Sequence, residues 1–109
     1  MGLTRAAILE ANEMQPVVVP VPEWGGDVLV RPLTLGEMSA LLPKIQRDGD
    51  VSVDLVIACA CDDSGVLLFS PDDADALRSK HYAAMQRVAM VALKVNRMRK
   101  EDTEELEKN

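Results

Sequence analysis

The residues with the greatest capacity for chemistry are two cysteines, an adjacent acidic pair and one histidine further along the chain. Cys59, Cys61, Asp62, Asp63 and His81 are of the types that commonly hold a metal ion. A Cys-x-Cys pair on a helix points its sulfurs about 200° apart, and structural zinc sites prefer roughly two to four intervening residues plus a second pair. We therefore interpret both cysteines as buried structural thiols, not a disulfide framework, and expect no metal and no other cofactor.

Other catalytic patterns are equally weak. His81 has no triad partners in view and is best explained as a helix cap or a surface residue. The aspartates at 72, 73 and 75 do not follow the calcium-loop pattern, and helix capping explains them. The sequence contains no Gly-rich phosphate loop and no nucleophile elbow. These observations predict a protein that is not an enzyme.

Two features point instead to binding of another protein. Trp24, the only tryptophan, occupies the tip of a predicted hairpin, where it either folds back as a lid on the core or anchors a partner. The six methionines either fill the core or offer adaptable apolar surface to an elongated helical partner. Our hypothesis is that a groove beside the C-terminal helix, lined partly by Met85, Met90 or Met98, binds that partner.

Composition limits the class of protein. With 109 residues, of which 48% are hydrophobic, the chain is expected to form one small globular domain over residues 1–99. A net charge of −6 gives it no electrostatic reason to bind nucleic acid. No secretory signal is visible, and a cytoplasmic, non-membrane protein is the default expectation. Residues 100–109 carry one large apolar side chain and are predicted to form an acidic flexible tail.

The longest helical pattern runs from Lys80 to Met98. Apolar residues recur there at spacings of three and four, and others widen the apolar surface beyond one face. Arg87 and Lys94 argue against a membrane span, so this is predicted to be a core helix that other elements surround.

The N-terminal third is predicted to hold a short helix and a hairpin. Leu3 to Asn12 forms the helix, which is too short to persist without docking on something. Two β-rich runs flank Gly25-Gly26 within about residues 16–32, which predicts a hairpin with a two-residue primed turn. Prolines of one parity in the first run mark it as an edge strand.

Helices are predicted for most of the chain after residue 34. Thr34 and Glu37 have capping-box spacing, and Pro43 predicts a kink or a break in the helix that follows. Val51 to Cys61 is read as a buried helix, and Ser70 as the cap of another. The predicted fold is mainly α with a small N-terminal β-hairpin (α+β), its helices packed around a long C-terminal apolar helix.

The order of these elements resembles a known family. The following segments carry the resemblance: Met1–Leu9 (MGLTRAAIL), Val19–Val28 (VPVPEWGGDV), Val30–Thr34 (VRPLT), Glu37 and the acidic tail ending Glu107-Lys108-Asn109. The resemblance spans most of the chain in its order of elements, and it is specific only in Pro22–Glu37 and at the two termini. On these residues the chain is similar to the tail assembly chaperones of long-tailed, siphovirus-type bacteriophages and prophages.

The resemblance implies a non-catalytic assembly factor in the cytoplasm of the bacterial host. Such chaperones coat the long helical tape measure protein, recruit tail tube subunits and are absent from the mature virion. Self-association into a homo-oligomer is left open. The alternative is a structural head-tail connector or tail-completion protein that stays in the virion, and a small enzyme or metal sensor using Cys59, Cys61 and His81 is a third alternative.

Overall fold

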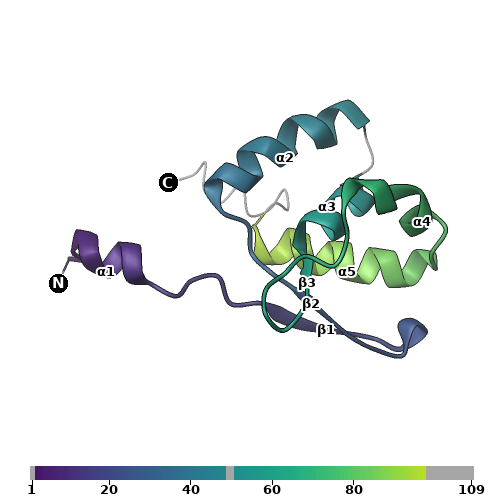
Figure 1. Cartoon of the computed structure of the whole chain (residues 1–109), viewed down its shortest axis with the longest axis horizontal. Coiled ribbons are helices and arrows are strands. Elements are labelled where there is room, and N and C mark those ends of the chain that lie inside the picture. The colour runs from purple at the N-terminus through teal and green to yellow at the C-terminus, as the bar shows by residue number, and fades with distance from the viewer. Residues whose placement is uncertain (1, 49–50, 98–109) are drawn as a thin grey trace.

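The structure is a computed structural model that describes residues 2–48 and 51–97. Within these ranges the chain forms five α-helices and one three-stranded antiparallel sheet (Figure 1). The helices gather on one side of the sheet, and a short N-terminal helix stands apart from the rest of the molecule. The predicted α+β class, mostly helical with a small sheet near the N-terminus, is confirmed. The predicted tail at 100–109 lies outside the described residues.

The sheet has the strand order β1-β2-β3 and places the predicted edge strand at its edge. β1 (Val17–Val21) pairs with β2 (Gly26–Val30), with Val17 opposite Val30 and Val21 opposite Gly26. Val19, Val21 and Val30 turn inward and are buried, while the side chains between them on β1 are exposed. This alternation is what a strand with one buried face requires.

A third strand, β3 (Ala60–Cys61), pairs with the far edge of β2 and was not predicted from the sequence. The helix expected over Val51 to Cys61 ends at Cys59, where the chain turns extended so that Ala60 lies opposite Val30. The prediction was wrong here because the pairing partner on β2 is distant in sequence, and local propensity carries no information about it.

The hairpin turn also differs from the predicted Gly-Gly pair. A 3₁₀ turn, η1 (Pro22–Trp24), follows β1, and its end is closed by a hydrogen bond of 3.0 Å from the Gly25 amide to the Pro22 carbonyl. Gly25 alone has positive φ, at 78°, and Gly26 already belongs to β2. Proline suits the first position of a helical turn, since its φ is fixed and its missing N–H is not needed there. The turn therefore begins earlier than predicted.

Helix α2 (Leu35–Asp48) starts at the predicted capping box and continues through Pro43 without a break. The Glu37 amide donates to Thr34 Oγ1 over 3.1 Å, and the Thr34 amide donates to Glu37 Oε1 over 3.0 Å. Pro43 removes one helical hydrogen bond, but the turns on either side are long enough to continue the helix. The break that the sequence allowed does not occur.

Helix α3 (Val51–Cys59) is the most thoroughly buried of the described helices. Six of its nine residues are buried, including one charged residue, Asp54. It packs against α5, α2 and α4 (Ala74–Arg78), a short helix that follows the 3₁₀ turn η2 (Pro71–Asp73). Its apolar residues surround the helix axis, as expected of a helix that other elements enclose.

Helix α5 (Tyr82–Val95) is shorter than the predicted stretch from Lys80 to Met98. It begins after His81, whose Nδ1 accepts a hydrogen bond of 3.1 Å from the Ala83 amide, and it ends before Arg97, which has φ of 54°. It has 14 residues, the same number as α2. One face of α5 packs on α3, β1 and β2, and the following residues are buried: Ala84, Met85, Val88, Ala89 and Ala92.

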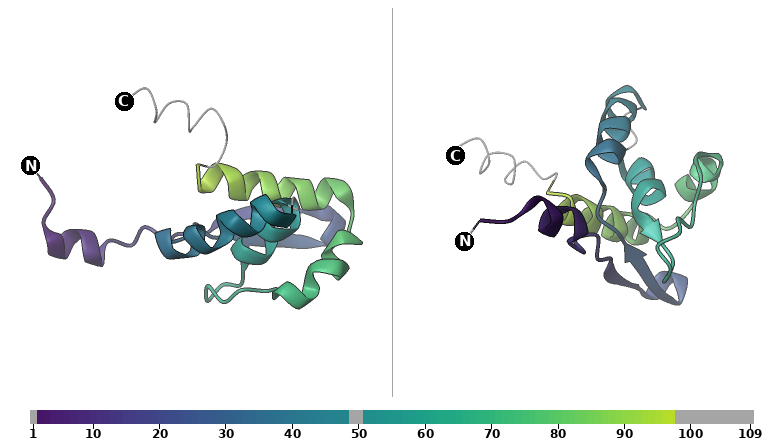
Figure 2. Two further views of the ribbon diagram at one scale, coloured as in Figure 1. Left: turned by 90° about the horizontal axis from the view of Figure 1, so that it is seen from above. Right: turned by 60° about the vertical axis from the view of Figure 1, so that its left-hand side comes forward.

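Helix α1 (Arg5–Glu10) has the predicted Thr4 cap, with Thr4 Oγ1 accepting from the Ala7 amide over 3.1 Å. None of its residues is buried, and Figures 1 and 2 show it beyond the end of the sheet. The docking that the sequence predicted for this helix is not seen within the described chain.

Candidate partner-binding clefts

The hairpin tip holds Trp24 against the protein core. Trp24 is half-buried and packs on the buried core cluster, and within the described chain its buried indole Nε1 has no hydrogen-bond partner. Gly25, in the left-handed region, ends the 3₁₀ turn that carries the ring. The placement fits the interpretation of Trp24 as a lid, and a role as partner anchor stays a prediction.

A bidentate ion pair between Arg87 and Glu23 joins this tip to α5. Arg87 donates from Nη1 to Glu23 Oε1 over 2.7 Å and from Nη2 to Glu23 Oε2 over 2.9 Å. The hydrogen bonds from Arg87 are the largest cause lowering the pKa of Glu23 to about 2, and the Glu23 carboxylate in turn raises the pKa of Arg87. Paired parallel hydrogen bonds of this kind restrict orientation as well as distance. Trp24 is thereby held next to the N-terminal half of α5.

Two clefts open beside the lid, and we call them together the Leu77 clefts because Leu77 and Lys80 line both. The first, of about 380 Å³, is lined by Glu23, Trp24, Phe69, Leu77 and Lys80. The second, of about 280 Å³, is lined by Ser52, Val53, Leu77, Arg78, Lys80, Tyr82, Met85 and Gln86. They lie where the hairpin tip, α4 and the start of α5 meet. Two adjoining clefts of this size, each lined by apolar and polar residues together, suit successive side chains of one amphipathic helix.

Of the predicted partner-binding residues, the structure brings two together. Trp24 lines the first of the Leu77 clefts and Met85 lines the second, although most of the Met85 side chain is buried in the core. Met90 is 51% exposed and lines neither cleft, and Met98 lies outside the described residues. The predicted groove lined by Met85, Met90 or Met98 stays a prediction.

Sequence reasoning missed Leu77, Lys80 and Tyr82 as cleft residues. Leu77 is buried at the end of α4, whereas Tyr82, the first residue of α5, is 76% exposed. The sequence shows that Tyr82 follows Lys80 by two residues, but only the structure shows that the aromatic ring is exposed. Only the fold shows that Tyr82 lines the cleft next to the one that Trp24 lines.

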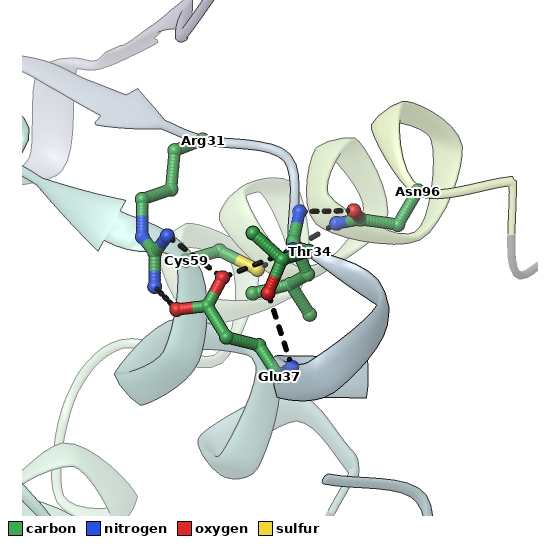
Figure 3. Close-up of polar contacts among 6 residues, drawn as sticks. Arg31, Thr34, Glu37, Cys59 and Asn96 are labelled. Atoms are coloured by element: carbon green, nitrogen blue, oxygen red, sulfur yellow. Dashed lines mark hydrogen bonds and ion pairs between the residues drawn. The ribbon is translucent and has the colours of Figure 1, made fainter. Parts of the chain in front are cut away.

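A second group of polar residues ties β2, α2 and α3 at the other end of α5 (Figure 3). Arg31 donates to both carboxylate oxygens of Glu37, over 3.1 and 2.6 Å, while Glu37 also completes the α2 cap with Thr34. The bonds from Arg31 are the largest cause lowering the pKa of Glu37 to about 2. Because both terminal nitrogens of Arg31 bind Glu37, and Glu37 also closes the cap, this ion pair fixes the start of α2.

Asn96 closes α5 and joins it to this group. Its Oδ1 accepts from the Leu33 amide over 2.7 Å, and its Nδ2 donates to the Ala92 carbonyl over 3.0 Å and to Cys59 Sγ at 3.7 Å (Figure 3). Burial raises the pKa of Cys59 to about 11 and also raises that of Cys61. Both cysteines are free and buried, as predicted, and at neutral pH they remain thiols with little nucleophilic or metal-binding character.

The described residues give little support to other kinds of site. Residues 2–48 and 51–97 contain no cluster of three or more His, Cys, Asp or Glu side chains placed to hold a metal ion. No helix in the same part of the chain has the length and apolarity needed to cross a membrane. His81 is exposed and caps α5, which confirms its predicted place at a helix start.

Comparison with known proteins identifies the fold. No protein-family model matches the sequence, and no curated protein matches it. Among solved structures, the tail assembly chaperone of bacteriophage HK97 matches with a TM-score of 0.60 over 84% of this chain and 89% of that chain. The two sequences are 24% identical across the match. The chain thus has the fold of a phage tail assembly chaperone.

Proposed function

We propose that this protein is a non-catalytic bacteriophage tail assembly chaperone, which binds the tape measure protein and tail tube subunits in the bacterial cytoplasm. The observation that carries the proposal is the shared fold with the HK97 tail assembly chaperone, which extends over most of both chains. The resemblance of the segment Pro22–Glu37 to this family, reached from sequence, supports the same conclusion independently. In this proposal the protein leaves the assembly before the virion is complete.

The Leu77 clefts are the proposed contact with the tape measure protein. Their walls combine Trp24, Leu77 and Met85, while Lys80 lines both. An amphipathic helix buries apolar side chains at spacings of three and four residues in such hollows. Methionine and tryptophan walls accept varied apolar side chains, which suits a chaperone for a long helical protein.

Co-expression with the long helical tape measure candidate of the same phage tests the proposal. We expect the candidate to become soluble and to co-purify with this protein. Tyr82→Ala removes an exposed cleft side chain and should reduce co-purification several-fold without changing the melting temperature. Val66→Ala removes an exposed apolar side chain elsewhere and is the matched control.

A tape measure candidate that stays insoluble beside abundant wild-type protein would contradict the chaperone proposal. If Tyr82→Ala and Val66→Ala both co-purify like wild type, the function stands but the assignment of the Leu77 clefts is wrong. Proteomics of mature particles separates the alternative function. A chaperone is absent from them, whereas a head-tail connector or tail-completion protein is present in fixed copy number.

A further inference from the structure

Among the described residues, one charged side chain of the Leu77 clefts has no ion-pair partner. Glu23 accepts hydrogen bonds from Arg87 at both carboxylate oxygens, over 2.7 and 2.9 Å. Arg78 pairs with Asp75 over 2.6 Å. Lys80 is exposed, and no ion pair compensates its charge within the same part of the chain. On a chain whose net charge is −6, the clefts thus present a local positive charge.

Lys80 lies where the two clefts adjoin. It lines both of them together with Leu77, which is buried at the end of α4. Trp24 lines the first cleft and Tyr82 lines the second, so each cleft has an aromatic wall. A ligand that places one side chain in each cleft therefore passes beside Lys80.

Both aromatic walls are held by hydrogen bonds that form without a ligand. Gln86 donates from Nε2 to the Tyr82 hydroxyl oxygen over 3.1 Å, across one turn of α5. Trp24 follows Glu23 in the 3₁₀ turn that Arg87 joins to α5. Because the walls are positioned in advance, the clefts favour ligands whose side chains already match their spacing.

An amphipathic helix can present two apolar side chains and one charge in this arrangement. Side chains three, four and seven positions apart share one helical face, and seven positions span about 10 Å along the axis. A residue three positions after the first apolar side chain lies between the two on the same face. An acidic residue at that place is attracted by Lys80, whereas a basic residue there is repelled.

We propose that the Leu77 clefts select an amphipathic helix that carries a carboxylate between two large apolar side chains, and that Lys80 pairs with this carboxylate. The apolar side chains enter the clefts and supply most of the affinity, whereas the ion pair decides which helix binds. This inference rests on the proposed function, since it specifies the kind of tape measure segment that the chaperone binds. Segments with a basic residue between the same apolar side chains are disfavoured.

Titration of the full-length protein with two designed peptides tests this selection. The fluorescence of Trp24, the only tryptophan and a wall of the first cleft, reports binding. Both peptides are Ala-rich helices of about 18 residues without Trp or Tyr, with leucines seven positions apart. Three positions after the first leucine, one peptide carries Glu and the other carries Lys. Wild type should bind the Glu peptide about ten-fold more tightly, because the Lys peptide replaces an exposed attraction by a repulsion of similar size.

Two charge variants separate a local effect at Lys80 from an effect of net charge. Lys80→Glu should reverse the preference, so that the Lys peptide binds more tightly. Lys94→Glu makes the same change in net charge at an exposed position near the other end of α5, where Lys94 lines neither cleft. This control should keep the wild-type preference. Both variants should remain folded during the titration, since both lysines are exposed.

The proposal is overturned if wild type binds both peptides equally, or binds neither. It is also overturned if Lys80→Glu and Lys94→Glu change the preference alike, since that result assigns the selection to net charge. These outcomes are distinct from the test of the proposed function. If the peptides are not distinguished but the tape measure protein co-purifies, the function stands and the selection at Lys80 is wrong. If the Glu peptide is preferred while the tape measure candidate stays insoluble, the function alone is contradicted.

Discussion

Replacing Asn96 with alanine removes the side chain that joins the end of α5 to the connection between β2 and α2. The Leu33 amide loses its acceptor at 2.7 Å, and the Ala92 carbonyl loses a donor at 3.0 Å. A polar group that is left unsatisfied in a partly buried place costs about 1–3 kcal/mol, and the loss of an ordinary hydrogen bond costs about 1 kcal/mol. The contact with Cys59 Sγ at 3.7 Å is long and adds little.

We therefore expect Asn96→Ala to lower the free energy of unfolding by about 2 kcal/mol. In a domain of this size that corresponds to a fall in melting temperature of roughly 8–16 °C. Urea unfolding followed by the fluorescence of Trp24, the only tryptophan, measures it directly. The midpoint should fall while the slope of the transition stays constant, because the surface exposed on unfolding is unchanged.

Lys94→Ala is the control, since Lys94 lies in the same last turn of α5 and is exposed. It should change the free energy of unfolding by less than about 0.5 kcal/mol. Equal midpoints for Asn96→Ala and Lys94→Ala would show that Asn96 does not tie these elements together. The role assigned to it would then be wrong.

Three further changes test other parts of the fold. Val88→Ala, at a fully buried site on α5, should cost about 2 kcal/mol in thermal unfolding, whereas the exposed Met90→Ala should be nearly neutral. Gly25→Ala should cost about 1 kcal/mol because φ there is 78°, and an unchanged urea midpoint would contradict the turn geometry. Glu37 has a folded-state pKa of about 2, below its usual 4.5, so its pairing with Arg31 stabilises the fold above about pH 4.5 and is lost as the pH falls through about 2. Glu37→Gln keeps capping geometry but should reduce that loss, seen as urea midpoints that differ less between about pH 5 and pH 2.5.

Local signals in the sequence predicted helix starts well. The caps at Thr4, Thr34 and Ser70 are all present, because each depends on residues within one turn of the chain. The same local reasoning was wrong for β3. There the deciding interaction is pairing with β2, a strand far away in sequence, and no pattern within Val51 to Cys61 reports it.

The candidate site was only partly predictable for the same reason. Trp24 was singled out because a tryptophan at a hairpin tip is unusual, and it does line a cleft. Met85 and Met90 could not be distinguished by residue type, yet one is buried and the other exposed. The packing of the whole domain sets which side of α5 faces α3. This packing decides that Met85 is buried and Met90 is exposed.

The two ends of α5 are both fixed by polar contacts between distant segments, and this arrangement bears on binding. Glu23 and Arg87 hold the hairpin tip beside the Leu77 clefts, while Asn96 and Leu33 hold the C-terminal end of α5. Apolar packing alone tolerates small shifts of one element past another, whereas paired hydrogen bonds fix both distance and direction. A cleft that is held in place before its ligand arrives loses less conformational entropy on binding, so a short helix with few apolar side chains can bind there. Arg87→Ala should therefore weaken tape measure binding at the Leu77 clefts, although Arg87 lines neither cleft. Unchanged binding by a variant that remains folded would show that the clefts keep their shape without this ion pair.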